Sequence, residues 1–363
     1  MNNDTPMISI CASCYNHAPY IPFFMETLLK QDFRDWELIV TDDCSTDGSY
    51  EALQSYSSDP RVHVYRTDCN RHVCQTSNHS YTKARGKYVC IFSTDDAFAE
   101  GKLAHDVDYL EKHPHISVLY DNMCIIGEDN TPAKDAKKSW KHRTDYDQYQ
   151  FLHRLFTRGN CMMIPGMVVR KSCMDAIGLL NPLLQLTQDY EYHIRLMLNY
   201  EIAISDAALT YYRRRDNEQN LSAGTPENEN HSDNEVMLLL SGCVQQIKGV
   251  SQFRRIFPEF DRYSDLTDAD IPFYTGLLLV ESKSTAIRSA GLRILYDFVS
   301  SNTAYVESKY GFYAKDFMAI ARRVQCSFRD QLVSRGQITR PLDRLIYTIW
   351  ASMRRKLRRR GII

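Results

Sequence analysis

Two pairs of adjacent carboxylates follow short apolar runs of the sequence. Asp42–Asp43 come directly after the run 36–41, and Asp95–Asp96 come directly after the run 88–92. Like charges this close repel each other, and a cation or a dense set of hydrogen-bond donors relieves the repulsion. Carboxylate oxygens on a loop suit Mg²⁺ or Mn²⁺, ions that can be shared with substrate phosphates. A single acidic pair, however, is more often a turn or a helix cap than a metal site.

A third carboxylate, Asp189, stands at the start of a predicted amphipathic helix over Tyr190–Leu198. The helix dipole favours the ionised form of an acid at this position. An ionised carboxylate is what a proton acceptor requires. Ordinary helix-start acids look the same, so Asp189 in isolation does not identify a base. His193 is interpreted as a packed or surface histidine rather than a metal ligand.

The elements that must position these acids are predicted from hydrophobic patterning over the first 125 residues. The predicted strands cover residues 7–12, 36–41, 62–65, 88–92 and 117–120. The predicted helices cover residues 21–30, 49–56, 76–84 and 102–112. Such alternation is typical of βαβ units and a mainly parallel sheet, in which ligands bind beyond the carboxyl ends of the strands. The sequence therefore predicts an α/β fold with both acidic pairs at its ligand-binding edge.

The remainder of the chain divides into polar and helical parts. Residues 128–143 are predicted to be an exposed loop, and residues 160–215 contain two more strand-like runs. Residues 215–235 are almost devoid of apolar side chains, which predicts a mobile segment that is either a lid over a ligand or an inert linker. Beyond that segment the pattern is mostly helical.

Composition limits the class of protein. The chain has 363 residues, a net charge of −1 and 11 scattered cysteines, which fits a soluble, reduced, cytosolic protein of two domains or one large α/β domain with an extension. The CxxC motif of Cys11 and Cys14 lacks the partners of a zinc site and is interpreted as two small apolar strand residues. We see no secretory signal. The longest apolar stretch, residues 271–280, is about half of what a membrane span needs.

Taken together, these motifs resemble glycosyltransferase family 2. The resemblance covers about residues 7–222 and rests on their joint order: Tyr15-Asn16, Asp42-Asp43, Asp95-Asp96, Gln188-Asp189-Tyr190 and Tyr211-Tyr212-Arg213. Segments such as WELIVTDDCSTDGS and ARGKYVCIFSTDD look like its hallmark stretches. The resemblance implies a glycosyltransferase A-type fold, a nucleotide-sugar donor, a divalent metal (Mn²⁺ or Mg²⁺) and inversion at the anomeric carbon.

The resemblance also implies roles for individual residues. Those expected to bind the nucleotide are Ser13, Tyr15, Asp43, Arg71 and Asp95. Asp96 would bind the metal on the diphosphate, and Asp189 matches the catalytic base. The stretch Arg213–Arg215 is where many members carry a Tyr-Arg-x-His pattern, so Arg213, Arg214 and Arg215 are expected diphosphate contacts.

Two positions depart from the family pattern. Gln188 replaces the acidic residue that usually precedes the base, although the base itself is kept. No histidine follows Arg213 at the expected place, so an arginine would have to substitute for any metal or phosphate contact made there.

The end of the chain is predicted to be a basic amphipathic helix over residues 341–363. Its apolar stripe consists of Leu342, Leu345, Ile346, Ile349, Trp350, Met353 and Leu357. Residues 334–363 hold nine basic side chains against Asp343, a net charge of +8 that leaves −9 for the rest of the chain. This helix either binds an anionic membrane surface or packs on the protein. Nucleic acid is not an expected partner, because no recognition motif accompanies the charge.

We therefore predict a catalytic domain over 1–222, a helical extension over 223–340 and the basic helix over 341–363. The predicted function is transfer of a sugar, most simply from a UDP-sugar, to a glycan or lipid-linked glycan in bacterial polysaccharide or glycolipid assembly, such as O-antigen or capsule. The predicted location is the inner face of the cytoplasmic membrane, as a peripheral protein. The alternatives are a nucleotide-sugar-binding subunit that has lost catalysis and a nucleotidyltransferase. The latter would need a Gly-rich basic loop after the first strand, which residues 13–17 do not provide.

Overall fold

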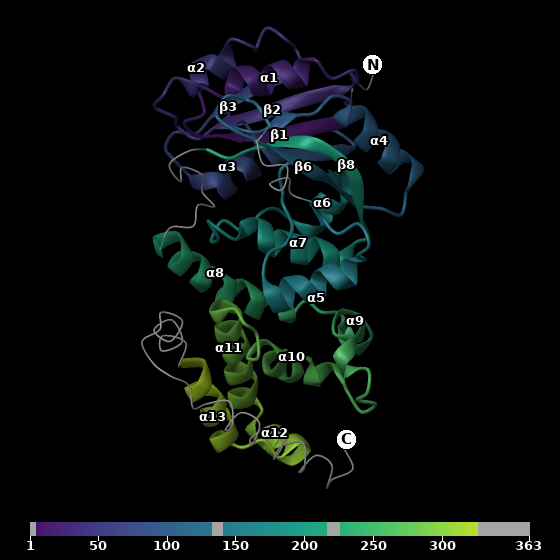
Figure 1. Cartoon of the computed structure of the whole chain (residues 1–363), viewed down its shortest axis with the longest axis vertical. Coiled ribbons are helices and arrows are strands. Elements are labelled where there is room, and N and C mark those ends of the chain that lie inside the picture. Colours follow the sequence, from purple (N-terminus) through teal and green to yellow (C-terminus); the bar gives the residue numbers. More distant parts are fainter. Residues whose placement is uncertain (1–4, 133–140, 216–225, 326–363) are drawn as a thin grey trace. The chain divides into compact units, whose positions relative to one another are not determined.

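The computed structural model describes residues 5–132, 141–215 and 226–325 (Figure 1). The chain divides into two compact units. The first lies within residues 1–155 and 160–235, and the second within residues 156–159 and 236–363. The predicted helix over 341–363 lies outside the described residues.

The first unit is built on a mixed sheet that has eight strands in the described part of the chain. Its strands are β1 (Ile8–Cys14), β2 (Trp36–Asp42), β3 (Val62–Arg66), β4 (Tyr88–Ser93), β5 (Ala97–Phe98), β6 (Val118–Ile126), β7 (Val168–Arg170) and β8 (Ile202–Arg213). Their spatial order is β3-β2-β1-β4-β7-β6-β8-β5. Strands β1 to β4 are parallel to one another, β7 is antiparallel to both of its neighbours, and β5 is antiparallel to β8. The predicted α/β fold with a mainly parallel sheet is confirmed.

Helices cover both faces of the parallel strands. The helices of this unit are α1 (Ile21–Leu29), α2 (Ser49–Gln54), α3 (His72–Tyr81), α4 (Lys102–Lys112), α5 (Gln148–Arg158), α6 (Lys171–Ile177) and α7 (Gln188–Asn199). In Figure 1, α1 and α2 lie on one side of β1 to β3 and α3 lies on the other. A strand buried on both faces reads as a continuous apolar run, which is why these strands could be predicted from the sequence.

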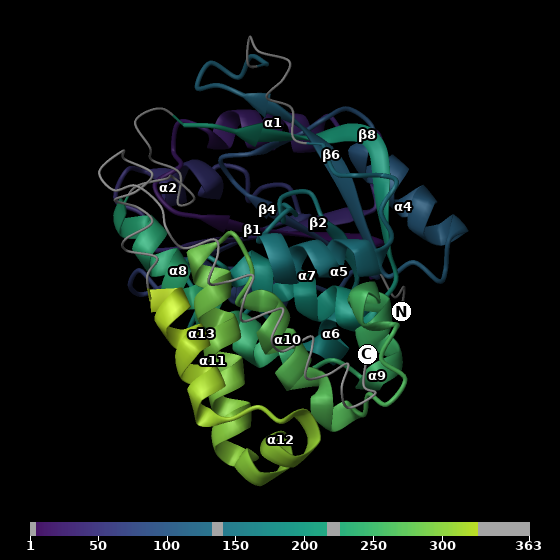
Figure 2. The same cartoon turned by 60° about the horizontal axis from the view of Figure 1, so that its bottom comes forward.

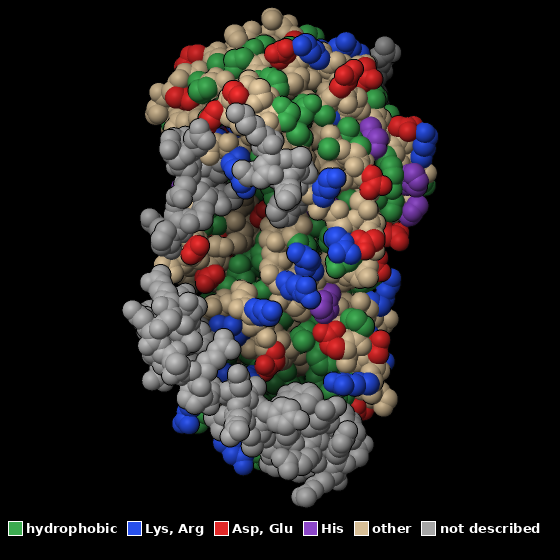
Figure 3. Space-filling view, in the orientation of Figure 1, with side chains coloured by type: hydrophobic (Ala, Val, Ile, Leu, Met, Phe, Trp, Pro, Cys, Tyr) green, Lys and Arg blue, Asp and Glu red, His purple; other side chains and the backbone are tan. Residues whose placement is uncertain are grey.

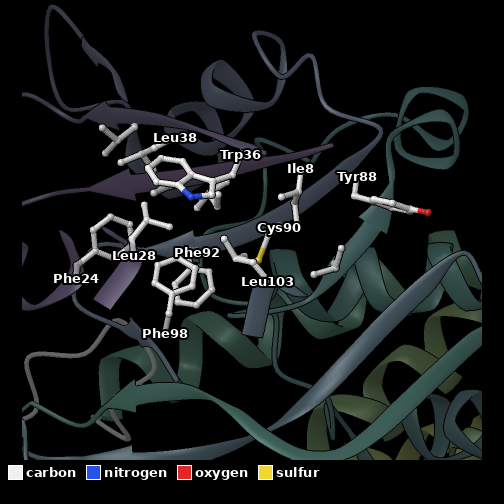
Figure 4. Packing of buried hydrophobic residues seen from close by; sticks show 14 of the residues in the cluster. Ile8, Phe24, Leu28, Trp36, Leu38, Tyr88, Cys90, Phe92, Phe98 and Leu103 are labelled. Atoms are coloured by element: carbon white, nitrogen blue, oxygen red, sulfur yellow. The ribbon is translucent and has the colours of Figure 1, made fainter. Parts of the chain in front are cut away.

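A hydrophobic core fixes the central strands against α1 and α4. Phe24 and Leu28 of α1 and Leu103 of α4 are fully buried against side chains of β1, β2 and β4 (Figure 4). The rings of Phe92 and Phe98 stack with their centroids 4.1 Å apart. Burying each such side chain contributes about 1.5–3 kcal/mol. The core therefore holds rigidly the strands whose carboxyl ends carry the acidic pairs.

The second unit is helical in its described part. Helix α8 (Pro226–Val244) leads into it, and the helices that follow are α9 (Gly249–Ile256), α10 (Ile271–Leu279), α11 (Thr285–Ser301), α12 (Thr303–Tyr310) and α13 (Ala314–Gln325). Helix α11 packs against α10 and α13 (Figure 2). A Cβ on Gly291 of α11 would lie 2.7 Å from the backbone nitrogen of Val280, so glycine permits this close approach of α11 to the end of α10. The predicted helical C-terminal region is confirmed as far as Gln325.

The structure corrects one expectation about the polar segment. Residues 226–235 form the first part of α8, whereas their polarity predicted a mobile stretch. Helix α8 begins at Pro226, and proline is well suited to the first position of a helix. Of the lid or linker expected over residues 215–235, residues 216–225 lie outside the described residues.

Charged side chains of both signs lie on the face of the molecule that Figure 3 draws. On the face seen in Figure 3, acidic and basic side chains are interspersed. In the ranges that the structure describes, none of the helices has the length and apolar character that crossing a bilayer demands. Cys11 and Cys14 are free and buried in β1.

Candidate active site

The loops after β1, β2 and β4 meet at one edge of the sheet. Ser13 pairs in register with Thr41 on one side and with Ser93 on the other, so these strands end side by side. Asn16 has a positive φ of 53°, and its amide oxygen accepts a 3.0 Å hydrogen bond from the Thr46 N–H. The loops after β1 and β2 are thus joined to each other, as the predicted ligand-binding edge requires.

Asp43 is buried and held by the loop that follows β3. Its Oδ1 accepts hydrogen bonds from the Thr67 hydroxyl at 3.0 Å and from the Arg71 backbone N–H at 2.8 Å. Its own N–H donates to the Cys14 carbonyl at 2.8 Å. Asp43 therefore sits where β1, β2 and the loop after β3 converge.

Three other residues expected to bind the nucleotide, Ser13, Tyr15 and Arg71, differ in their contacts and exposure. The Ser13 carbonyl accepts a 3.1 Å hydrogen bond from the Thr94 N–H, which ties it to the loop that carries the second acidic pair. The Tyr15 side chain is 44% exposed, so its ring face is accessible for stacking. The Arg71 guanidinium does not contact Asp43; it pairs with Asp68 at 2.7 Å on the surface.

Asp95 is buried among positive and polar groups. Its Oδ1 accepts a 2.5 Å hydrogen bond from the Ser93 hydroxyl, and its Oδ2 lies 3.7 Å from His17 Nε2 and 3.5 Å from Arg215 Nε. Burial alone would raise the pKa of Asp95, but His17, the Ser93 hydroxyl and Arg215 together hold this pKa below its ordinary value. Asp95 is therefore a carboxylate anion within the fold.

Asp96 lies beside Asp95 in a different environment. Its Oδ1 accepts a 2.9 Å hydrogen bond from the Arg213 backbone N–H. Burial and the neighbouring Asp95 charge raise the pKa of Asp96 well above its ordinary value. The fold therefore disfavours a lone anion at Asp96, and a bound cation would stabilise that anion. Its second oxygen accepts no hydrogen bond from the described residues.

These observations test whether the site fits a divalent metal. Within the described ranges, no three His, Cys, Asp or Glu side chains gather closely enough to hold a metal ion by themselves. Asp96 nevertheless has a carboxylate oxygen that accepts no hydrogen bond from the described residues, and it is buried beside the carboxylate of Asp95. Such a hard oxygen donor suits Mn²⁺ or Mg²⁺ when phosphate oxygens supply further ligands. The residues present fit a metal that is shared with a diphosphate.

The three arginines at the end of β8 differ in position. Arg213 is fully buried, and its guanidinium donates to the Asp95 carbonyl at 2.7 Å and lies 4.7 Å from the centre of the Tyr20 ring. Arg215 points to Asp95, as described above. The Arg214 side chain is exposed and its backbone N–H donates to Ile126. The structure therefore brings Arg213 and Arg215, but not the Arg214 side chain, to the acidic pair.

Asp189 lies in the first turn of α7 and is half-buried. Its Oδ2 accepts a 3.1 Å hydrogen bond from the Asn160 side-chain amide, and its Oδ1 accepts one from the Tyr190 N–H at 2.7 Å. Burial raises the pKa of Asp189 to about 6. A carboxyl group with this pKa is ionised at neutral pH and is more basic than an ordinary aspartate, as a general base should be.

Sequence reasoning missed two contributors. His17 is buried, shares a 2.9 Å hydrogen bond with the Thr94 hydroxyl and faces Asp95. Its place directly after Tyr15-Asn16 was the available signal. Asn160 contacts Asp189 from 29 residues away, and no local pattern marks it.

Comparison with known proteins places this geometry in a family. Residues 9–172 match the model of glycosyl transferase family 2. The putative teichuronic acid biosynthesis glycosyltransferase TuaG of Bacillus subtilis is 30% identical over 133 residues, which are 36% of this chain and 52% of TuaG. The putative colanic acid biosynthesis glycosyl transferase WcaA of Escherichia coli is 26% identical over 200 residues, 54% of this chain and 68% of WcaA. The matches to the first relatives, TuaG and the putative glycosyltransferase EpsE of B. subtilis, span about half the length of those proteins.

Solved structures extend the likeness beyond the matched domain. S. aureus TarS 1–349, determined in complex with UDP-GlcNAc, superposes with a TM-score of 0.59 at 20% identity and covers 92% of this chain and 93% of its own. At this identity the likeness concerns the fold alone. The sheet, its helices and the helical region after them therefore follow the glycosyltransferase A-type architecture, and residues 9–172 of this chain belong to glycosyltransferase family 2.

Proposed function

We propose that the protein is an inverting glycosyltransferase that moves a sugar from a nucleotide-sugar to an acceptor hydroxyl in bacterial polysaccharide or glycolipid assembly. The observation that carries this proposal is the buried pair Asp95–Asp96, which meets Arg213 and Arg215 at the carboxyl edge of the sheet. Anions and cations interleaved in this way suit a ligand that brings both a diphosphate and a divalent cation.

The proposed donor is a UDP-sugar. Asp43 would accept a hydrogen bond from the base, Ser13 and Tyr15 would flank the base and ribose, and Asp95 would face the ribose or the sugar. Two lines of support favour uridine: TarS was solved with UDP and with UDP-GlcNAc, and it shares the fold. The names of TuaG and WcaA point to teichuronic and colanic acid biosynthesis, which supports a polysaccharide or glycolipid acceptor.

Asp96 would hold Mn²⁺ or Mg²⁺ together with the donor diphosphate. When bound, such a metal neutralises charge that develops on the departing nucleoside diphosphate. A mannosyltransferase of Pyrobaculum calidifontis on a related fold was solved with GDP-Man and Mn²⁺, which supports a divalent cofactor. Arg215, near Asp95, would add positive charge at the same place.

Asp189 would act as the general base. Its carboxylate takes the proton of the acceptor hydroxyl while that oxygen forms a bond to the anomeric carbon. The bond from the anomeric carbon to the phosphate oxygen breaks, and the nucleoside diphosphate leaves with the electron pair. Attack opposite the leaving group inverts the anomeric configuration. The pKa of about 6 at Asp189 suits this role at neutral pH.

A donor screen tests the proposal. Release of nucleoside diphosphate from a panel of nucleotide sugars is measured with Mn²⁺ and with Mg²⁺, in the presence of glycan and lipid-linked acceptors. The proposal expects release with one class of donor, most simply UDP-sugars, and dependence on the metal. Binding of a nucleotide sugar without any release would favour the binding-subunit alternative that Gln188 suggested.

A further inference from the structure

The loop that precedes the candidate base is held by a buried glutamate from a distant part of the chain. Glu235 lies on α8 and is only 4% exposed. Its carboxylate accepts hydrogen bonds from the backbone N–H groups of Gln185 at 2.6 Å, Leu186 at 2.9 Å and Thr187 at 2.9 Å. The Thr187 hydroxyl donates another at 2.9 Å. One side chain therefore gathers four donors from three consecutive residues.

These three residues lead directly into the candidate base. Thr187 is the N-cap of α7, and Asp189 is the second residue of that helix. An N-cap threonine usually turns its side chain toward the helix N–H groups, but here the Thr187 hydroxyl is committed to Glu235 instead. Hydrogen bonds to a carboxylate are among the stronger ones in proteins, so four of them together fix this loop. The direction in which α7 begins is therefore set by Glu235.

Glu235 and Asp189 are close enough for the charge of one to affect the pKa of the other. Glu235 adds to the causes that raise the pKa of Asp189, although burial is the largest of them. His231 Nε2 lies 3.1 Å from Glu235 at the exposed end of the contact. The other titratable groups around the pair are Cys74 of α3, Tyr120 of β6 and Glu191 of α7, the last of which is paired with Arg195.

We propose that Glu235 is a positioning residue for Asp189. By clamping residues 185–187 it fixes the first turn of α7, so that the Asp189 carboxylate is presented to the acceptor hydroxyl in one orientation. The inference rests on the proposed function, in which Asp189 is the base. In this proposal the role of α8 is to carry Glu235, which the polarity of its sequence did not indicate.

The test compares Glu235→Gln, Glu235→Asp and a matched control. Glu235→Gln keeps the size of the side chain but turns one acceptor oxygen into a donor, so at least one N–H loses its partner. Glu235→Asp keeps the charge but shortens the reach. Because a misplacement of about 1 Å at a reacting group can cost roughly 10²-fold, we expect kcat to fall by that order in both variants while the KM for the donor stays unchanged.

Asp270→Asn is the matched control. Asp270 is also a buried carboxylate with several donors, among them Thr267 at 2.8 Å and Lys309 at 2.6 Å, but it lies in the second unit. We expect this variant to lower Tm and to leave kcat of the folded enzyme at the wild-type value. Loss of activity that merely follows loss of stability would affect both proteins alike.

Two further readouts separate positioning from a purely structural role. In Glu235→Gln, a negative charge near Asp189 is lost, so the pKa of Asp189 should fall and the decrease of kcat on acidification should begin at a lower pH. In Glu235→Asp the charge is kept, and this acid limb of the pH profile should not move. The amides of residues 185–187 should exchange hydrogen faster in both variants and remain protected in Asp270→Asn. Folded Glu235→Gln with wild-type kcat and an unmoved acid limb would overturn the proposal. Wild-type turnover by Asp189→Asn would instead overturn the assignment of Asp189 as the base, on which the inference rests. No release by the wild-type protein in the donor screen would overturn the proposed function itself.

Discussion

The backbone N–H of Arg213 donates a 2.9 Å hydrogen bond to Asp96 Oδ1, across 117 residues of sequence. The buried Arg213 guanidinium donates at the same time to the Asp95 carbonyl. The end of β8 thus holds the acidic pair from one side through both its backbone and its side chain. Arg213 is in this respect a scaffold for Asp95 and Asp96, and Arg215 is the arginine whose guanidinium faces a carboxylate of the pair.

Substitution of Asp96 by asparagine should remove the metal-dependent part of nucleotide binding. The substitution keeps the acceptor for the Arg213 N–H but removes the anionic oxygen that would hold the cation. Titration calorimetry with UDP, with and without Mn²⁺, measures the effect. Asp175→Asn serves as control, since Asp175 is exposed and pairs with Lys171 on α6. Equal enhancement by Mn²⁺ in Asp96→Asn and wild type would remove Asp96 from the metal site.

A residue of this site could be predicted from the sequence where its position follows from the order of the strands. The positions of Asp43 and Asp95 were predictable, because parallel strands end at the same edge and each acid follows an apolar run. The approach of Arg213 was not, because it depends on pairing of β8 with the two-residue strand β5, in register Ala97↔Tyr211. So short a strand leaves no periodicity to detect.

Other contacts lacked a local signal for a different reason. His17 meets Asp95, and Glu235 meets the loop before α7, only because packing brings together segments that are 48 or more residues apart. Polarity alone predicted a mobile stretch at Glu235. Glu235, at the end of that polar stretch, is buried and accepts hydrogen bonds from the loop before α7, a contact that polarity does not reveal.

Substitution of Asp189 by asparagine should abolish transfer and spare nucleotide binding. Loss of general-base assistance typically costs about 10²–10⁴-fold in rate. Because the fold raises the pKa of Asp189, the ionised carboxylate is less stable in the folded protein than in the unfolded chain. Removing this charge should therefore leave the variant at least as stable as wild type at pH 7. Single-turnover transfer, calorimetry with UDP and thermal unfolding measure the three quantities. A clear fall in Tm would mean that the activity loss reflects folding instead.

The rate of transfer should depend on pH through the same carboxylate. The pKa of Asp189 is about 6 and the base acts as the anion. The value of kcat should therefore be constant above this pH and fall about tenfold per unit below it. Folding measured by circular dichroism across the same range provides the control. An acid limb centred near pH 4 would show that burial does not shift Asp189 in the active enzyme.

Arg71 and Asp68 offer a test of the base- or phosphate-contacting role proposed for Arg71. Their ion pair is exposed, and exposed pairs are weak, so the guanidinium can leave Asp68 for a nucleotide at little cost. If it does, Arg71→Ala should raise the Kd for UDP, and Asp68→Asn should leave the Kd unchanged or lower it. The bond from the backbone N–H of residue 71 to Asp43 is available in both variants. Unchanged Kd in Arg71→Ala would leave that N–H as the sole contribution of this residue.

The basic stretch 341–363 should decide where the enzyme works. A chain truncated after Arg340 loses the apolar stripe and seven of the nine basic residues of its last thirty. Because each basic residue near an anionic surface contributes about 1 kcal/mol, the full-length protein should sediment with phosphatidylglycerol vesicles at low salt and the truncated protein should not. Phosphatidylcholine vesicles are the control for the charge.

A second variant separates membrane binding from packing of this stretch on the protein. Replacing Arg354, Arg355, Lys356, Arg358, Arg359 and Arg360 by glutamine removes the charge and keeps the stripe of Leu342 to Leu357. An amphipathic helix held at a bilayer by charge and apolar area together should lose most of its affinity in this variant and become insensitive to salt. A helix packed on the protein would instead leave vesicle binding absent in every form, and truncation would then lower Tm.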